Sequence, residues 1–391
     1  MKSSLLKIEC KTDIQGIRSL RQSMESLYSL ALGMIPGVGS IGAKRLLAFT
    51  GSAEAVFRLS RAQLLEIPGV GSIMAGRILD KSVFGRAQEE LEYIRENNIV
   101  CLFYGDEKSY PERLRYCEDA PLVLYTRGKL DVNGRKTLSI VGTRRPSSYG
   151  MDSCRKLIKD LSERFPDLVI VSGLAYGIDH CAHKTALELG LDTVAVLGHG
   201  LKFLYPAIHR QTARSIELSG ALVTDFPSWE KPERNNFIKR NRIIAGLSEA
   251  TIVVESGVKG GALITADLAN SYHRDVFALP GRVIDPHAAG CNSLIKSHRA
   301  ALIEDYKDVE YLLGWEQADE IRQVIPKNKF RELTMEENSI LQVLESEGDA
   351  STDLICFHTR LPVSRVSGIL LDLELAGTIR ALPGNCYRLI R

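Results

Sequence analysis

Short apolar runs alternate with amphipathic stretches through the middle of the chain. Apolar runs bounded by turn residues are typical of buried strands. They occupy residues 99–104, 122–125, 139–141, 168–171, 193–197, 221–224, 250–254 and 275–279. Several of the intervening segments, such as 151–165 and 178–189, have the spacing of helices with one buried face. This alternation predicts a parallel sheet with helices on both faces, which is a doubly wound α/β domain.

An internal repeat precedes this region. Each copy places a Pro-Gly-x-Gly hairpin between two segments of helical pattern, first at Ile35–Gly39 and again at Ile67–Gly71, and so resembles a helix-hairpin-helix motif. Hairpin glycines and the helix N-terminus that follows them can offer N–H groups to a phosphate. The basic residues beside the hairpins are Lys44, Arg45 and Arg77. With so few charges, two interpretations stay open: a contact with DNA, or a module that only packs helices together.

The end of the chain has a different pattern. Residues 332–391 predict three short helices, at about 335–345, 351–359 and 362–376, followed by an apolar hairpin with its turn at 383–385. This is the layout of a winged-helix domain. Its third helix carries a single positive charge over residues 363–368, so a protein contact or a structural role is as consistent as DNA reading. The polar, proline-interrupted segment 316–331 is predicted to be a linker.

Small, hydroxyl and basic residues follow several of the predicted strands. In a doubly wound sheet, ligands bind beyond the carboxyl ends of the strands. A glycine turn with an arginine beside it is typical of an anion site, because backbone N–H groups and fixed charge converge there. These residues therefore predict one continuous anion-binding rim. Its members are Gly142, Thr143, Arg144, Ser172, Gly173, Lys202, Lys259, Gly260 and Gly261.

A basic segment, residues 231–242, adds to this rim. It contains five positive residues, one negative residue and an aromatic ring, Phe237. Single-stranded nucleic acid needs cations for its backbone and rings for its bases, so this segment favours a strand as the ligand. Phe237 fits either a stacking role or a core-filling role. The candidate contacts are Lys239, Arg240, Asn241 and Arg242.

Composition sets limits on these interpretations. Lys plus Arg (50) nearly balances Asp plus Glu (48), so the nucleic-acid signal comes only from local clusters. The eight cysteines include no CxxC pair, and neither a signal peptide nor a membrane-spanning run is recognisable, so we expect a cytoplasmic protein without membrane contact. His180 and His183 share a helix face, but no third ligand has a supporting spacing. We expect buried, hydrogen-bonded histidines rather than a metal site, and no cofactor.

Taken together, these motifs resemble the bacterial DNA-processing protein A family, also called Smf. The resemblance covers nearly the whole chain and rests on the ordered elements VGTRRPSSYG, VSGLAYGIDHCAH, VLGHGLKFLYP, NFIKRNRIIAGLSEATIVVES, GALITA, LPG and GCNSLI. It implies a tandem helix-hairpin-helix domain over 1–95, an extended Rossmann-like core over 96–315, a linker over 316–331 and a winged helix over 332–391.

The resemblance also implies a function. The family binds single-stranded DNA without sequence preference and without catalysis, protects incoming DNA in natural transformation, and loads the RecA recombinase. RecA, single-strand-binding protein and a second copy of the chain, joined through the core, are the partners that it implies.

The family's site elements fall on Gly142 and Arg144, on Ser172–Asp179, on Lys239–Arg242 and on Lys259–Gly261. The chain departs from the family at two places. The family commonly has Ser-Gly-Ser where Gly260–Ala262 stand, so hydroxyl donors are lost. It often has an acidic residue where Lys202 stands, which makes this rim more positive.

An enzymatic function is the rival hypothesis. Similar sheets serve nucleotide phosphoribohydrolases, which use arginines and glycine loops at the same rim. Their Pro-Gly-Gly-x-Gly-Thr signature is absent, and residues 259–265 are only a partial likeness. Glu255 is the one carboxylate placed to act as a catalytic acid. A dinucleotide oxidoreductase is disfavoured because no GxGxxG element follows a predicted strand of the sheet.

Overall fold

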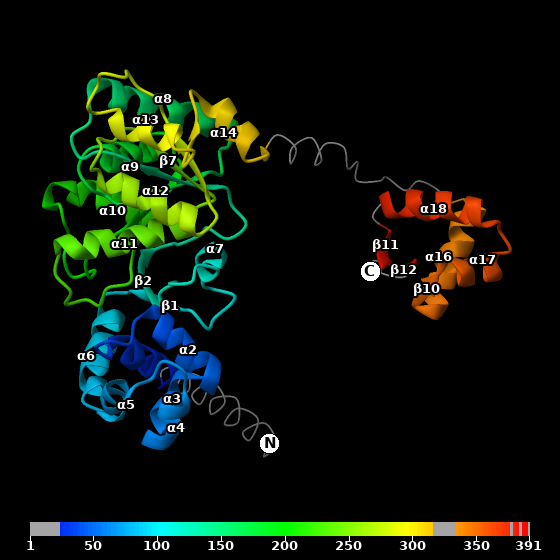
Figure 1. Ribbon diagram of the computed structural model, residues 1–391, viewed down its shortest axis with the longest axis horizontal. Coiled ribbons are helices and arrows are strands. Elements are labelled where there is room, and N and C mark those ends of the chain that lie inside the picture. Colours follow the sequence, from blue (N-terminus) through cyan, green and yellow to red (C-terminus); the bar gives the residue numbers. More distant parts are fainter. Residues whose placement is uncertain (1–23, 316–333, 376–377, 383–384, 390–391) are drawn as a thin grey trace, which may run out of the picture. The chain divides into compact units, whose positions relative to one another are not determined.

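The computed structural model describes residues 24–315, 334–375, 378–382 and 385–389 (Figure 1). The chain divides into two compact units, one up to Gly314 and one from Trp315 onward. The predicted linker, 316–331, lies outside the described residues, as does the centre of the hairpin turn at 383–384. None of the described helices is both long enough and apolar enough to cross a membrane.

A nine-stranded sheet forms the centre of the first unit, and its strands lie in the order β1-β2-β6-β5-β4-β3-β7-β8-β9. The strands are β1 (Val100–Phe103), β2 (Val123–Gly128), β3 (Thr137–Val141), β4 (Val169–Ser172), β5 (Asp192–Val196), β6 (Ala221–Thr224), β7 (Ala250–Val253), β8 (Asp275–Ala278) and β9 (Ala301–Leu302). Every neighbouring pair from β6 to β9 is parallel. This part of the sheet confirms the predicted doubly wound α/β core.

Two features of the sheet differ from the simple alternation that the sequence predicts. The pairs β1–β2 and β2–β6 are antiparallel. Buried strands have the same apolar pattern whether they are parallel or antiparallel to their neighbours, so the sequence did not predict this antiparallel edge. The short strand β9 was also not predicted from the sequence; it has only two residues, and both are exposed.

Helices cover both faces of the sheet. Besides the short α7 (Glu112–Arg115), they are α8 (Ser148–Arg164), α9 (Ile178–Glu188), α10 (Arg210–Ser219), α11 (Arg234–Leu247), α12 (Gly261–Ser271), α13 (Ala289–Lys296) and α14 (Tyr306–Leu312). On one face, side chains of α11, α12 and α13 pack against Val141, Val171 and Val253 of the strands. On the other face, α10 packs against Ala195 and Leu222. Because consecutive strand residues point to opposite faces, the strands contribute buried side chains to both layers.

The N-terminal helices contain the predicted repeat. After a helical segment at 24–34 come α2 (Ser40–Thr50), α3 (Ala53–Arg58), α4 (Arg61–Glu66), α5 (Ser72–Leu79) and α6 (Val83–Glu96). Their buried side chains form one hydrophobic cluster with residues of β2 and β6 in the core. A buried carboxylate also links the two regions, since Glu90 of α6 accepts hydrogen bonds from the backbone N–H and the hydroxyl of Ser228.

The basic residues beside the two hairpins bind the protein's own backbone. Arg45 of the first copy donates to the carbonyl of Pro68 in the second hairpin (3.1 Å), and Arg77 donates to Pro36 in the first (2.8 Å). Lys44 donates to the carbonyl of Cys117 in the core (2.9 Å). This reciprocal arrangement supports the interpretation of the repeat as a packing module, because each arginine is already engaged by the opposite hairpin.

The second unit is a small helical domain with a three-stranded sheet. It consists of α16 (Met335–Glu347), β10 (Asp349–Ser351), α17 (Thr352–Thr359), α18 (Val363–Leu375), β11 (Ile379–Leu382) and β12 (Cys386–Leu389), with the sheet order β10-β12-β11. Side chains from all three helices and from β11 form its core. The three helices and the hairpin agree with the predicted winged-helix layout, and β10 adds a third strand to it.

The histidines of α9 make internal hydrogen bonds. Nδ1 of His183 lies 2.7 Å from the hydroxyl of Thr193, and its Nε2 accepts a hydrogen bond from the Leu174 N–H (3.3 Å). Nε2 of His180 lies 3.1 Å from the hydroxyl of Thr212. Among the described residues, no group of three or more His, Cys, Asp or Glu side chains is arranged to hold a metal ion. The pKa of His183 is lowered to about 3, mainly by burial and in addition by the neighbouring His180, Arg240 and His209.

We predict that His183 makes the fold sensitive to acid. The unfolded chain protonates this residue below about pH 6.5, whereas the folded chain does so only near pH 3. Its contribution to stability is therefore complete above pH 6.5 and is lost as the pH falls, with a slope of about 1.4 kcal/mol per pH unit. Urea unfolding at several pH values from 4.5 to 7 gives the free energy of unfolding as a function of pH. Its slope against pH should be shallower for His183→Gln than for the wild type. The exposed His287→Gln should keep the wild-type slope, and equal slopes for all three proteins would contradict the assignment.

Candidate functional site

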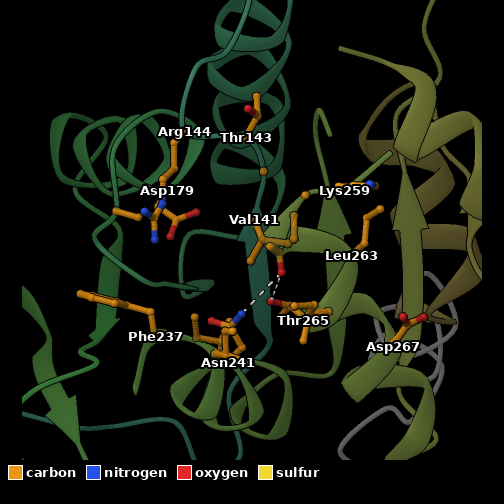
Figure 2. Close-up of a pocket in the computed structure, with 18 of the residues that line it drawn as sticks. Val141, Thr143, Arg144, Asp179, Phe237, Asn241, Lys259, Leu263, Thr265 and Asp267 are labelled. Carbon is orange, nitrogen blue, oxygen red and sulfur yellow. Dashed lines mark hydrogen bonds between the residues drawn. The ribbon is translucent and has the colours of Figure 1, made fainter. Parts of the chain in front are cut away.

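A pocket of about 710 Å³ opens at the carboxyl ends of β3 and β7 (Figure 2). The chain runs from β3 through β4 and β5 to β6 on one side of β3, and then returns to β7 on the other side. Strand order reverses at this point, and open α/β sheets bind ligands at such reversals. The pocket is lined by the segments after both strands, residues 142–144 and 258–261, together with one face of α11. The rim predicted from the sequence is therefore partly assembled here.

Basic side chains outnumber acidic ones around this pocket. The basic lining residues are Arg144, Arg234, Arg240, Lys259 and Arg299, and the acidic ones are Asp179 and Asp267. Arg144, Arg234 and Lys259 are exposed to solvent, whereas Asp267 is paired with Arg299 (2.8 Å). The exposed charge that faces a ligand is therefore positive.

The N-terminus of α12 adds backbone donors to the wall. Its N-cap, Gly260, forms no side-chain cap. The N–H of Leu263 donates to the Gly260 carbonyl (3.1 Å), and the N–H groups before it precede the regular hydrogen bonding of the helix. Gly261 is exposed beside them. The side-chain amide of Asn241 donates to the carbonyl of Gly261 (3.5 Å), and Figure 2 shows Asn241 on the wall of the pocket. A helix N-terminus and a lysine in one wall favour an anionic ligand.

Phe237 forms the aromatic part of the pocket. Its ring is half-buried and lies 5.5 Å from the ring of Tyr205. The guanidinium of Arg144 lies over the same ring at 5.7 Å (Figure 2). Phe237 therefore contacts Tyr205 on one side and lines the pocket, which is consistent with the stacking role that the sequence left open.

Gly142 and Thr143 have structural partners that the sequence did not reveal. A Cβ on Gly142 would lie 2.6 Å from Ile178, so this glycine is needed where α9 packs against β3. The N–H of Thr143 donates to the carbonyl of Glu255 (2.8 Å), and its hydroxyl accepts from the N–H of Arg145 (3.2 Å). Both residues line the pocket, but the backbone N–H of Thr143 is not free for a phosphate.

Arg240 has a structural role, which corrects the expectation that it contacts phosphate. Its side chain is only 3% exposed, and its guanidinium donates to the carbonyls of Gly173 (2.7 Å) and Val196. It thereby ties together the ends of β4 and β5. Burial raises the pKa of the nearby Asp179 carboxyl, while Arg240, Arg144 and the N–H groups of Ala175 and Gly173 counter this rise.

Ser172 and Gly173 also serve the interior rather than the pocket. Ser172 is fully buried, and its hydroxyl donates to the carbonyl of Ile140 (2.6 Å). A Cβ on Gly173 would lie 2.5 Å from the guanidinium of Arg240. Neither residue lines the pocket, so the expectation of ligand contacts from this segment is wrong for both.

The remaining predicted contacts lie away from this pocket. Arg242 points to the other side of α11, where it donates to the carbonyl of Asp119 and forms an ion pair with Asp225. Lys239 is exposed but lines a different cavity. Lys202 is exposed in the loop after β5 and lines neither cavity. Three residues that the sequence placed on one rim are thus separated by the fold.

Two lining arginines were not singled out from the sequence. Arg234 lies within the basic segment, so the same charge clustering was available to identify it. Arg299 follows α13 in a segment without a recognisable motif, and only the fold brings it beside Asp267. Glu255, the candidate acid of the enzymatic hypothesis, does not line the pocket. Its carboxylate instead accepts hydrogen bonds from the N–H and hydroxyl of Ser147, before α8.

Comparison with known families agrees with this arrangement. The family model described as DNA recombination-mediator protein A matches residues 101–314, which contain the sheet and the pocket. The chain belongs to the DprA/Smf family. A second model, the DprA winged helix domain, matches residues 326–385.

Similar proteins of the DprA/Smf family cover much of the chain. Protein Smf from Escherichia coli is 37% identical over 298 residues, which are 74% of this chain and 78% of that protein. Protein Smf from Synechocystis is 33% identical over 398 aligned residues, covering 93% and 98%. The X-ray structure of DNA processing protein A from Streptococcus pneumoniae superimposes with a TM-score of 0.62 at 31% identity, and covers 72% of this chain and 95% of that one.

We predict that Arg240 stabilises the fold of this DprA/Smf protein. Arg240→Met keeps most of the side-chain volume but removes the donors to the carbonyls of Gly173 and Val196 and the positive charge near Asp179. Each buried carbonyl left without its donor typically costs about 1–3 kcal/mol. Urea unfolding should show that loss, and the double variant Arg240→Met with Asp179→Asn should recover part of it. The exposed Arg145→Ala should change the free energy of unfolding by less than about 0.5 kcal/mol. An Arg240→Met protein as stable as wild type would contradict the structural role.

Proposed function

We propose that the chain binds single-stranded DNA in the pocket at the ends of β3 and β7, without sequence preference. The observation that carries this proposal is Arg144 lying over the half-buried ring of Phe237, in a pocket that the exposed Lys259 also lines. A cation next to a ring can serve a phosphate and a base at once, and that pairing is typical of single-strand binding sites. Membership of the DNA recombination-mediator family supports the same ligand.

The lining residues explain why this binding would not depend on sequence. Contacts from Arg144, Arg234 and Lys259 go to phosphates, which are the same at every nucleotide. The backbone donors at the start of α12 likewise recognise an anion rather than a base. The ring of Phe237 stacks on any base, because every base has a π-face.

We also propose that the pocket is not catalytic. Of its two carboxylates, Asp267 is paired with Arg299, and Asp179 is held beside Arg240 with little exposure. One observation favours the rival nucleotide phosphoribohydrolase hypothesis. Burial raises the pKa of Asp179 inside a basic pocket, and shifted carboxyls of this kind also occur in active sites.

The proposal extends to the cellular role that the family resemblance implies. Bound strands would be protected and passed to RecA, with displacement of single-strand-binding protein, during natural transformation. A second copy of the chain, joined through the core, would lengthen the binding surface. The seven cysteines among the described residues are free thiols, which suits the reducing cytoplasm in which such a reaction takes place.

Arg144→Ala is expected to weaken binding of labelled oligo-dT and oligo-dC alike, by about tenfold at low salt, because one phosphate contact is lost. For single strands, the slope of log K against log salt falls by about 0.7 for each neutralised phosphate. Fluorescence anisotropy at several salt concentrations should therefore give a shallower slope for the variant.

Arg145 offers a matched control for this measurement. It is the adjacent exposed arginine, and it does not line the pocket. Arg145→Ala should keep the affinity and the salt slope of the wild type. If Arg144→Ala behaves in the same way as Arg145→Ala, the pocket is not the strand-binding site.

Turnover of nucleotides separates the two hypotheses. The purified protein, incubated with each common nucleoside monophosphate, should release no free base, since no carboxylate in the pocket is both exposed and unpaired. Chromatography of the products gives the answer. Base release that disappears in Asp179→Asn would overturn the non-catalytic proposal.

A further inference from the structure

A second cavity, of about 420 Å³, lies between the N-terminal helices and the core. Its walls come from the first hairpin (Gly39), from α6 (Arg86), from the segment after β6 (Asp225 and Trp229) and from α11 (Lys239). Both regions belong to the same compact unit, and the hydrogen bond from Lys44 to Cys117 connects them. We propose that this cavity is a second binding site for the same DNA strand. The strand would cross α11, so that one nucleotide lies in the first pocket and a later nucleotide lies in this cavity.

The two cavities meet at consecutive residues of α11. Ile238 lines the first pocket, and the next residue, Lys239, lines the second. Ile238 is 42% exposed, and Lys239 is exposed as well, so the ridge between the cavities is open to solvent. A strand that leaves the first pocket over this ridge meets the Lys239 ammonium directly.

The second cavity repeats the chemistry of the first. Lys239 and Arg86 are exposed cations that suit phosphates, and Trp229 presents a ring with 38% of its surface exposed. Exposed rings beside cations are the recurring elements of single-strand binding surfaces. An apolar or acidic peptide would make poor use of that combination, because its backbone presents no regular anionic groups.

The acidic residues of this wall already have partners within the protein. Asp225 forms an ion pair with Arg242, and Glu230 accepts a hydrogen bond from the side chain of Asn236 (2.8 Å). The exposed Lys239 and Arg86 therefore determine the charge that a strand meets in this cavity.

The test uses the two tryptophans of the chain, Trp229 and Trp315. In a Trp315→Phe protein, Trp229 is the only source of tryptophan emission. Single-strand site sizes run from about 4 to 16 nucleotides, so dT4 and dT16 serve as the short and long probes. We expect dT16 to quench the emission of Trp229, and the dissociation constant from this quenching should equal the one measured by fluorescence anisotropy. We expect dT4, which fills the first pocket, to leave the emission unchanged.

Substitutions in the cavity should affect only the long strand. Lys239→Ala is expected to weaken dT16 about fivefold and to lower its salt slope by about 0.7, with dT4 binding unchanged. Trp229→Leu should cost at least about fivefold for dT16, and Trp229→Phe should retain most of the affinity, because stacking needs a ring. Lys159→Ala, an exposed lysine on α8, is the control and should bind both probes as wild type does.

This inference rests on the proposed function, and the results separate the two. If Arg144→Ala weakens the binding of dT16 while Lys239→Ala and Trp229→Leu do not, the second binding site is wrong and the proposal for the first pocket is kept. If Arg144→Ala changes neither probe, the proposed function itself fails. Quenching by thymidine monophosphate alone, or quenching by dT4 that depends on Lys239 but not on Arg144, would show an independent nucleotide site and overturn the shared path.

Discussion

The buried guanidinium of Arg240 is the interaction on which the site depends. It donates to carbonyls at the ends of β4 and β5 and lies beside the buried Asp179 at the start of α9. An arginine with almost no exposure is costly to bury unless its donors are satisfied. Here the ends of two strands and the first turn of a helix supply the partners, so the charge joins three elements. The floor of the pocket is set by this contact.

A fixed floor supports a rim of exposed side chains. The ring of Phe237 lies 5.8 Å from the guanidinium of Arg240 and 5.7 Å from that of Arg144, so one ring contacts both a buried cation and an exposed one. The division has an electrostatic consequence. The field of Arg240 is largely balanced by Asp179, whereas Arg144 faces solvent and can exchange counterions for phosphates. Two arginines close together in space therefore have opposite roles.

Sequence patterns predicted the sheet well because both of its faces are buried. Strands such as β3 and β7 contain only buried residues, and most of these residues are apolar. The site was predicted less completely. Residues that follow strand ends, such as Arg144 and Lys259, reach the pocket because topology alone puts them there. The positions of Arg240 and Arg242 are set by contacts with residues from other segments, including Asp179 and Asp225. The local sequence therefore could not predict that these two arginines are buried.

The basic segment shows the physical reason most clearly. Successive helix positions turn by about 100°, so neighbouring cations on α11 point in different directions. Arg240 points into the core, Arg242 toward Asp225, and Lys239 toward the N-terminal helices. The positive residues of one helical segment therefore contact different parts of the protein and have different roles. The first hairpin contributes to this division as well. Its glycine turn, at Gly39, and Lys239 line the same cavity, although the arginines beside the two hairpins donate to the protein's own carbonyls.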